Sequence, residues 1–161
     1  MLASLESSPF AAWVRVSVWG WPFWLSVHVI GTAVVIGFVV IVNLRLLGLF
    51  ETIPYTSLKR LFPVIWAAFA VQVISGIVLW TAKPTRYVAD GAFMLKILFV
   101  AIGFALLAYF YRTLEREAAA WDVNGTVSSS GVKFIAPTLL AWSAVLVAAR
   151  LTAYLGALPT G

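Results

Sequence analysis

Four long apolar stretches dominate this chain of 161 residues. Hydrophobic residues make up 63% of the chain and charged residues only 11%, whereas about a quarter of the residues in soluble domains are charged. Because one helical crossing of a bilayer needs about 20 apolar residues, four crossings use nearly the whole chain. The sequence therefore predicts an all-α integral membrane four-helix bundle in which residues 1–161 form a single membrane domain.

The predicted spans cover residues 21–42, 61–82, 92–111 and 135–158. Hydrocarbon offers no water to hydrogen-bond an open strand, so apolar runs of this length are expected to be helices. Ahead of the first span, residues 9–18 place apolar side chains at helical spacing, which predicts a short interfacial helix. The connection over residues 112–134 contains glycine and several serines, and it is expected to be the most mobile part of the chain.

Basic residues exceed acidic residues by 11 to 6, and the excess lies beside the spans. The first and third connections hold Arg45, Lys59, Arg60, Arg112, Arg116 and Lys133, against Arg15, Lys83 and Arg86 on the other side. Cytoplasmic connections carry the surplus of Lys and Arg, so both termini are predicted to be periplasmic, in a bacterial inner membrane. The charges form no continuous track for phosphates, so the expected partner is the lipid bilayer and not nucleic acid.

Three ionisable side chains lie within the predicted spans: His28, Lys96 and Arg150. A charged side chain at the centre of a bilayer costs at least about 2.5 kcal/mol on insertion scales, so such residues are functional candidates. With the predicted orientation all three fall in the outer leaflet, and Arg86 lies in the connection on the same side. The predicted spans contain no Asp or Glu to neutralise them. This layer predicts a site for an anionic ligand that also binds an imidazole.

Haem b meets both requirements, because a histidine nitrogen holds its iron and basic side chains pair with its propionates. We expect His28 to be the metal ligand and Lys96, Arg150 and Arg86 to hold the propionates, with Gly31 leaving room for the macrocycle. Met94 points away from Lys96 around its helix, so no second axial ligand is evident. The haem would be five-coordinate or shared in a homodimer. The chain would then transfer electrons or serve as the membrane partner of a redox enzyme.

Other interpretations remain open. In one alternative, His28 bonds a backbone carbonyl of a neighbouring helix and binds no ligand, and Gly31 and Gly76 serve only to permit close helix packing. The chain is then an accessory or scaffold subunit of a larger membrane complex, or it binds a quinone. Copper transport is disfavoured because soft metals need several Cys, Met or His ligands, and the chain has no cysteine and one histidine. No catalytic residue is assigned.

Several motifs together resemble a bacterial four-span membrane family of unknown function. They are His28-Val-Ile-Gly31, Asn43-Leu-Arg45-Leu-Leu-Gly48, Ala92-Phe-Met-Leu-Lys96 and the late Arg150; the family usually has aspartate at the position of Asn43. A more distant likeness is to the HemJ-type protoporphyrinogen oxidases and the copper-resistance D (CopD) membrane domain. In the HemJ-type family the matching histidine is implicated in binding haem b. The resemblance implies the same role for His28 and importance for Arg45 and Lys96.

Overall fold

Four long helical segments make up most of the protein. The computed structural model describes residues 2–155, which form helices and no strand. Helices α3 (Gly20–Leu46), α5 (Phe62–Thr81), α7 (Gly91–Asn124) and α8 (Ser129–Leu155) belong to four segments that are long and apolar enough to cross a membrane. The predicted all-α four-helix membrane bundle is confirmed.

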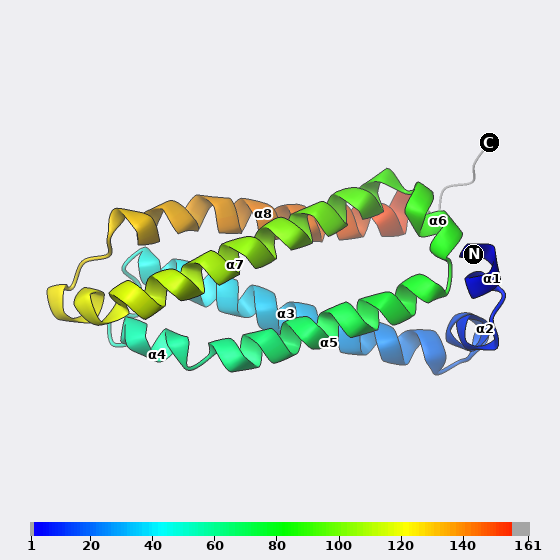
Figure 1. Ribbon diagram of the computed structural model, residues 1–161, viewed down its shortest axis with the longest axis horizontal. Helices are drawn as coiled ribbons and strands as arrows, with labels where there is room; N and C mark the ends of the chain where they lie inside the picture. Colours follow the sequence, from blue (N-terminus) through cyan, green and yellow to red (C-terminus); the bar gives the residue numbers. More distant parts are fainter. Residues whose placement is uncertain (1, 156–161) are drawn as a thin grey trace.

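Short helices cover the two ends of the bundle (Figure 1). Helices α1 (Leu2–Glu6), α2 (Pro9–Val16) and α6 (Pro84–Ala89) lie at one end, which we call the α6 end. Helix α4 (Tyr55–Lys59) lies at the opposite end, beside the turn between α7 and α8. Helix α2 occupies the position of the short helix predicted over residues 9–18, and its first turn is capped by the Ser8 side chain.

The long helices pack as two pairs, α3 with α5 and α7 with α8. Aromatic rings bridge the pairs in the half of the bundle near α4. Phe62 lies 4.8 Å from Tyr111 between ring centroids, and Trp66 lies 5.3 Å from Phe104. Such pairs bury large apolar surfaces and prefer tilted or edge-to-face arrangements. This half therefore contains most of the hydrophobic core.

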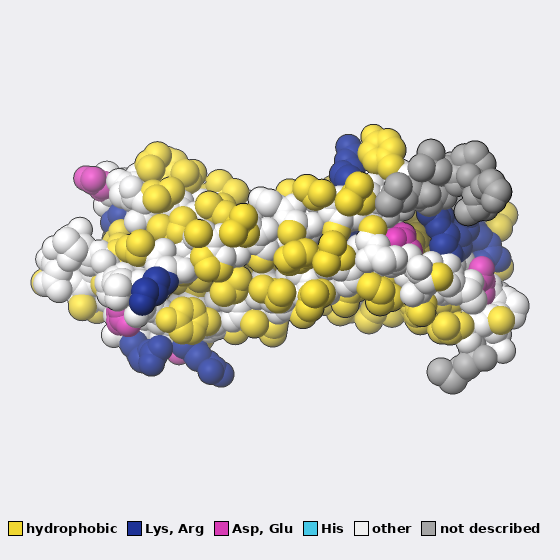
Figure 2. All heavy atoms as spheres, turned by 90° about the horizontal axis from the view of Figure 1, so that it is seen from above, with side chains coloured by type: hydrophobic (Ala, Val, Ile, Leu, Met, Phe, Trp, Pro, Cys, Tyr) yellow, Lys and Arg dark blue, Asp and Glu magenta, His cyan; other side chains and the backbone are white. Residues whose placement is uncertain are grey.

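The half near the α6 end is packed more loosely. Along α7 the buried residues begin at Gly103, and none of residues 91–102 is buried. On the face shown in Figure 2, hydrophobic side chains cover the middle of the molecule, whereas Lys and Arg lie toward its ends. A lipid-facing belt of this kind, together with four apolar helical segments, makes the chain a multi-pass membrane protein.

The extent of the connection predicted over residues 112–134 is wrong, because most of it is helical, while its expected mobility stays a prediction. Helix α7 continues to Asn124, since residues 112–121 are rich in Arg, Glu and Ala, which favour helices. It stops at Gly125, which has a left-handed φ of 67°. A helix of 34 residues is about 51 Å long and exceeds the hydrocarbon core of about 30 Å, so α7 extends beyond the bilayer.

The first and fourth spans also differ from their predicted bounds. Helix α3 ends at Leu46 instead of residue 42, because the side chain of Asn43 is buried and hydrogen-bonded within the bundle. Helix α8 begins at Ser129 instead of residue 135. The predicted end of the fourth span, over residues 156–158, lies outside the described residues.

Replacing Gly103 by Ala is expected to destabilise the bundle. A Cβ atom at Gly103 would lie 2.9 Å from Cε2 of the Trp142 ring, closer than van der Waals contact allows. Overpacking of this kind costs about 1–3 kcal/mol. Thermal unfolding in detergent should show a lower midpoint for Gly103→Ala. Gly37→Ala is the matched control, because nothing lies within 4 Å of a Cβ there and its midpoint should be unchanged or raised. Equal midpoints for both variants would contradict the packing of α7 on α8.

Candidate functional site

His28 lies in the first half of α3 and turns its ring toward α5. Its Nδ1 atom is 3.0 Å from the backbone oxygen of Gln72 and 3.1 Å from Oγ of Ser75. The imidazole is half-buried, and it joins two helices at a level where α7 packs loosely. The carbonyl-bonded alternative considered for His28 is therefore confirmed as a contact.

The partners of Nδ1 define the tautomer of the ring. A backbone carbonyl only accepts hydrogen bonds, so Nδ1 must carry the proton that it shares with Gln72. The Ser75 hydroxyl lies 2.7 Å from the carbonyl of Val71 and donates to it, which leaves its lone pairs toward the imidazole. The Nε2 atom of neutral His28 is then unprotonated, and it has no hydrogen-bond partner within residues 2–155. Histidines that bind metals commonly have this arrangement: one ring nitrogen donates to a carbonyl, and the other, unprotonated nitrogen is available to the metal.

The two glycines near His28 serve helix packing. A Cβ atom at Gly31 would lie 3.1 Å from the backbone oxygen of Ala68, so this glycine faces α5 at close range. A Cβ atom at Gly76 would lie 3.2 Å from Cε1 of His28, so the ring rests against bare backbone. The prediction that Gly31 makes room for a macrocycle is wrong, because α5 already fills that space.

Lys96 lies on α7 one turn after Phe93 and one turn before Val100, on the half-buried face of the loosely packed half. Its ammonium donates no side-chain hydrogen bond within the described part of the chain. Its charge lies within electrostatic range of the His28 ring. His28 and Lys96 thus lie on two different helix pairs, and no hydrogen bond joins them within residues 2–155.

Arg150 and Arg86 do not join them. Arg150 is exposed on α8, with its guanidinium carbon 5.9 Å from the ring centroid of Tyr154, so the expectation that it faces inward is wrong. Arg86 lies on the short helix α6, 5.8 Å from the ring centroid of Tyr87, and lines a small cavity at the α6 end. The cationic layer predicted from the sequence thus reduces to Lys96 at the level of His28.

Two buried polar atoms have no hydrogen-bond partner among the described residues: Oε1 of Gln72 and Nε1 of Trp142. Gln72 is the residue whose carbonyl accepts from His28, so one residue holds the imidazole and carries an unpaired buried oxygen. Deeper in the bundle, Asn43 and Thr138 satisfy each other across α3 and α8, with Nδ2 3.2 Å from Oγ1. Unpaired buried polar atoms are uncommon, and both of these lie on membrane-spanning helices.

A second polar cluster lies at the α4 end and was not predicted. Nη1 of Arg45 donates to the hydroxyl of Tyr55 over 2.8 Å, and its guanidinium carbon lies 3.9 Å from the centroid of that ring. Oδ1 of Asp122, at the end of α7, accepts from the backbone N–H of Tyr55 over 2.6 Å, and Oδ2 accepts from the N–H and hydroxyl of Thr56. The cluster joins the ends of α3, α4 and α7. Arg45 is buried here, so it is not the exposed connection residue that the charge count assumed.

Only part of this cluster had a signal in the sequence. The resemblance to HemJ-type proteins implied importance for Arg45, but nothing local to Tyr55 or Asp122 indicates their pairing, because 67 residues separate them. Gln72 and Ser75 are polar residues within an apolar run of the sequence, but nothing local indicates their contact with His28.

Comparison with family models, with curated proteins and with solved structures finds no match to this chain. The family resemblance of the sequence stays a prediction, and the site rests on its own geometry.

Removing the Asp122 carboxylate is expected to loosen α4. Asp122→Ala leaves the first N–H groups of α4 without their acceptor, and the loss of such a cap costs about 1 kcal/mol. Unfolding in detergent should begin at a lower temperature than in the wild type. Glu51→Ala removes one acidic charge at an exposed position of the same end and should leave the midpoint unchanged. If the two variants behave alike, Asp122 does not hold α4.

Proposed function

We propose that this membrane protein binds haem b through Nε2 of His28 and that Lys96 pairs with a propionate. The observation that supports the proposal is the contact of His28 Nδ1 with the Gln72 carbonyl, which leaves Nε2 unprotonated and without a partner within residues 2–155. Lys96 provides a positive charge within electrostatic range of the ring.

His28 and Lys96 suit haem b, whereas two other residues predicted to hold it do not. A neutral imidazole held by a carbonyl suits the iron, and an ammonium with no acidic partner nearby suits a carboxylate. Gly31 faces α5 and Arg150 faces outward, so neither belongs to the proposed site. The haem would lie on the side of α7 residues 91–102, none of which is buried.

Haem b would supply one-electron exchange at this level of the bilayer. His28 would hold the iron from α3, and the carbonyl of Gln72 would orient its ring and raise the basicity of Nε2. Lys96 would fix the orientation of the group by its charge. The chain would thus pass electrons within the membrane or to a redox partner, with a homodimer as one way to complete the coordination.

We also propose that the α4 end faces the cytoplasm of a bacterial inner membrane. The basic residues of the first and third connections lie at this end, and cytoplasmic connections carry the surplus of Lys and Arg. Both termini then face the periplasm, and the site lies in the outer half of the bilayer.

The absorption spectrum of the full chain, purified after expression with haem supplied, tests the proposal. The wild type should show a Soret band, and His28→Ala should lose it. Lys96→Gln should weaken haem binding about tenfold or more, because one charge-assisted contact is lost. Lys133→Gln removes the same charge at an exposed position near the α4 end and should bind haem as the wild type does.

A variant of the same position separates ligand loss from misfolding. His28→Gly should regain the Soret band when imidazole is added, if the band depends on the nitrogen and not on the fold. A colourless wild type, or an unchanged band in His28→Ala, would overturn the proposal.

A quinone is the second candidate, supported by the complementary groups of the site. Unprotonated Nε2 of His28 accepts a hydrogen bond, and Lys96 donates one, which matches the hydroxyl and carbonyl oxygens of a quinol and a quinone. The loosely packed half of α7 would admit a flat ring from the lipid. A colourless protein that co-purifies with quinone, and loses it in His28→Ala, would favour this candidate over haem.

A further inference from the structure

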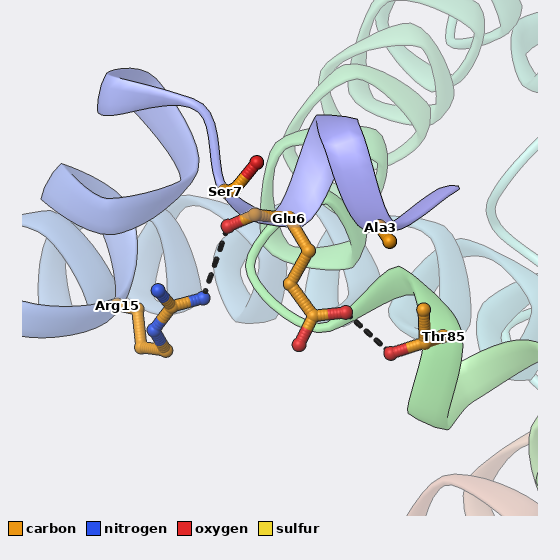
Figure 3. A pocket seen from close by; sticks show the side chains of 5 residues that line it. All are labelled: Ala3, Glu6, Ser7, Arg15 and Thr85. Atoms are coloured by element: carbon orange, nitrogen blue, oxygen red, sulfur yellow. Dashed lines mark hydrogen bonds between the residues drawn. The ribbon is translucent and has the colours of Figure 1, made fainter. Parts of the chain in front are cut away.

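Two adjoining cavities lie at the α6 end, and both are lined by Arg15. The larger, of about 430 Å³, is open and also lined by Glu6 and Thr85 of α1 and α6 (Figure 3). The smaller, of about 160 Å³, is more enclosed. It is lined by Arg15, Trp21, Ala82, Lys83, Arg86 and Tyr87. Three basic residues and two aromatic residues thus surround the smaller cavity, and its lining contains no acidic residue.

Contacts around Arg15 hold this end together, and none of the hydrogen bonds within residues 2–155 involves the side chains of Lys83 and Arg86. Nη1 of Arg15 donates to the carbonyl of Ala82 over 2.8 Å and to the carbonyl of Glu6 over 3.4 Å. The carboxylate of Glu6 accepts from the hydroxyl of Thr85, as Figure 3 shows, and not from a cation. Lys83 and Arg86 donate no side-chain hydrogen bond within the part of the chain that the structure describes. The smaller cavity is therefore strongly positive.

The size of the smaller cavity limits what it can hold. A water molecule occupies about 30 Å³ in the liquid, so the cavity has room for roughly five waters or for one tetrahedral anion. Pockets that enclose whole drug-sized ligands have volumes of about 300–1,000 Å³. A ligand here would place only its polar end in the protein.

The surroundings indicate where the rest of that ligand lies. The cavity is at the ends of α3 and α5, where Trp21 and Tyr87 supply the amphipathic rings that are typical of a membrane interface. Burial raises the pKa of the Tyr87 phenol above its ordinary value, so this hydroxyl stays protonated and can donate to an anion. The exposed apolar surface of the spans begins directly beside this end.

We propose that the smaller cavity binds the phosphodiester of an anionic phospholipid, with Lys83 and Arg86 as its main contacts and Arg15 as a third charge. Basic pockets at the membrane surface bind lipid phosphates in this way, and an arginine suits phosphate geometry particularly well. The acyl chains would lie along the apolar surface of the bundle. This site is separate from the proposed haem site and does not depend on it.

Native mass spectrometry of the full chain in neutral detergent tests the proposal with phosphatidylglycerol and phosphatidylcholine of matched acyl chains. The wild type should retain phosphatidylglycerol in preference. The double variant Lys83→Gln with Arg86→Gln should bind it roughly 30-fold more weakly, since each basic residue near an anionic surface contributes about fivefold. Circular dichroism confirms that the variant keeps its helices.

The matched control is the double variant Lys59→Gln with Arg60→Gln, which removes two positive charges at the α4 end and should retain the lipid. Equal loss in both double variants, or equal retention of both lipids by the wild type, would overturn the proposal. Competition by inorganic phosphate at millimolar concentration would overturn the lipid assignment in favour of a free phosphate. None of these readouts involves the Soret band, so the two proposals succeed or fail separately.

Discussion

Hydrocarbon gives a polar atom no hydrogen-bond partner other than the protein, and this constraint governs the polar residues of the four long helices. Most of them bond to a carbonyl one turn earlier on their own helix; these are Ser26, Thr32, Ser75, Thr113, Thr138 and Thr152. Asn43 bonds in the same way and also across the bundle to Thr138. His28 differs, because its contacts across to α5 satisfy one nitrogen and leave the other without a partner in the described chain. At this site the constraint is therefore only half met, as it also is at Nε1 of Trp142 among the described residues.

The packing of the bundle explains why this place is near the α6 end. Aromatic rings from α5 and α7 fill the half near α4, and the cluster of Arg45, Tyr55 and Asp122 closes that end. In the other half α7 carries Lys96 on a face that is only partly covered. The half near α4 is thus the more densely packed along α7, and the short helices at the other end line a separate cavity with three basic residues.

Helix length and type could be predicted from the sequence wherever apolar runs determine them, because lipid permits few alternatives. The extension of α7 could not, since its charged residues indicated a connection although they are also good helix formers. His28 and Lys96 were found because ionisable residues are rare in spans. The position of a residue along a helix does not show in which direction its side chain points. For this reason Arg150 was wrongly predicted to face inward, and Gly31 was wrongly assigned to a ligand. Contacts such as Tyr55 with Asp122 depend on the fold and leave no local pattern.

The central claim is that the proton of His28 lies on Nδ1, so that Nε2 is free for a ligand. The chain contains a single histidine, so labelling histidine with ¹⁵N and using a histidine-free tag gives an NMR spectrum of this ring alone. For the protein without added ligand at neutral pH, we expect a protonated Nδ1 and an unprotonated Nε2. A proton on Nε2 instead, or a ring that exchanges rapidly between both tautomers, would contradict it.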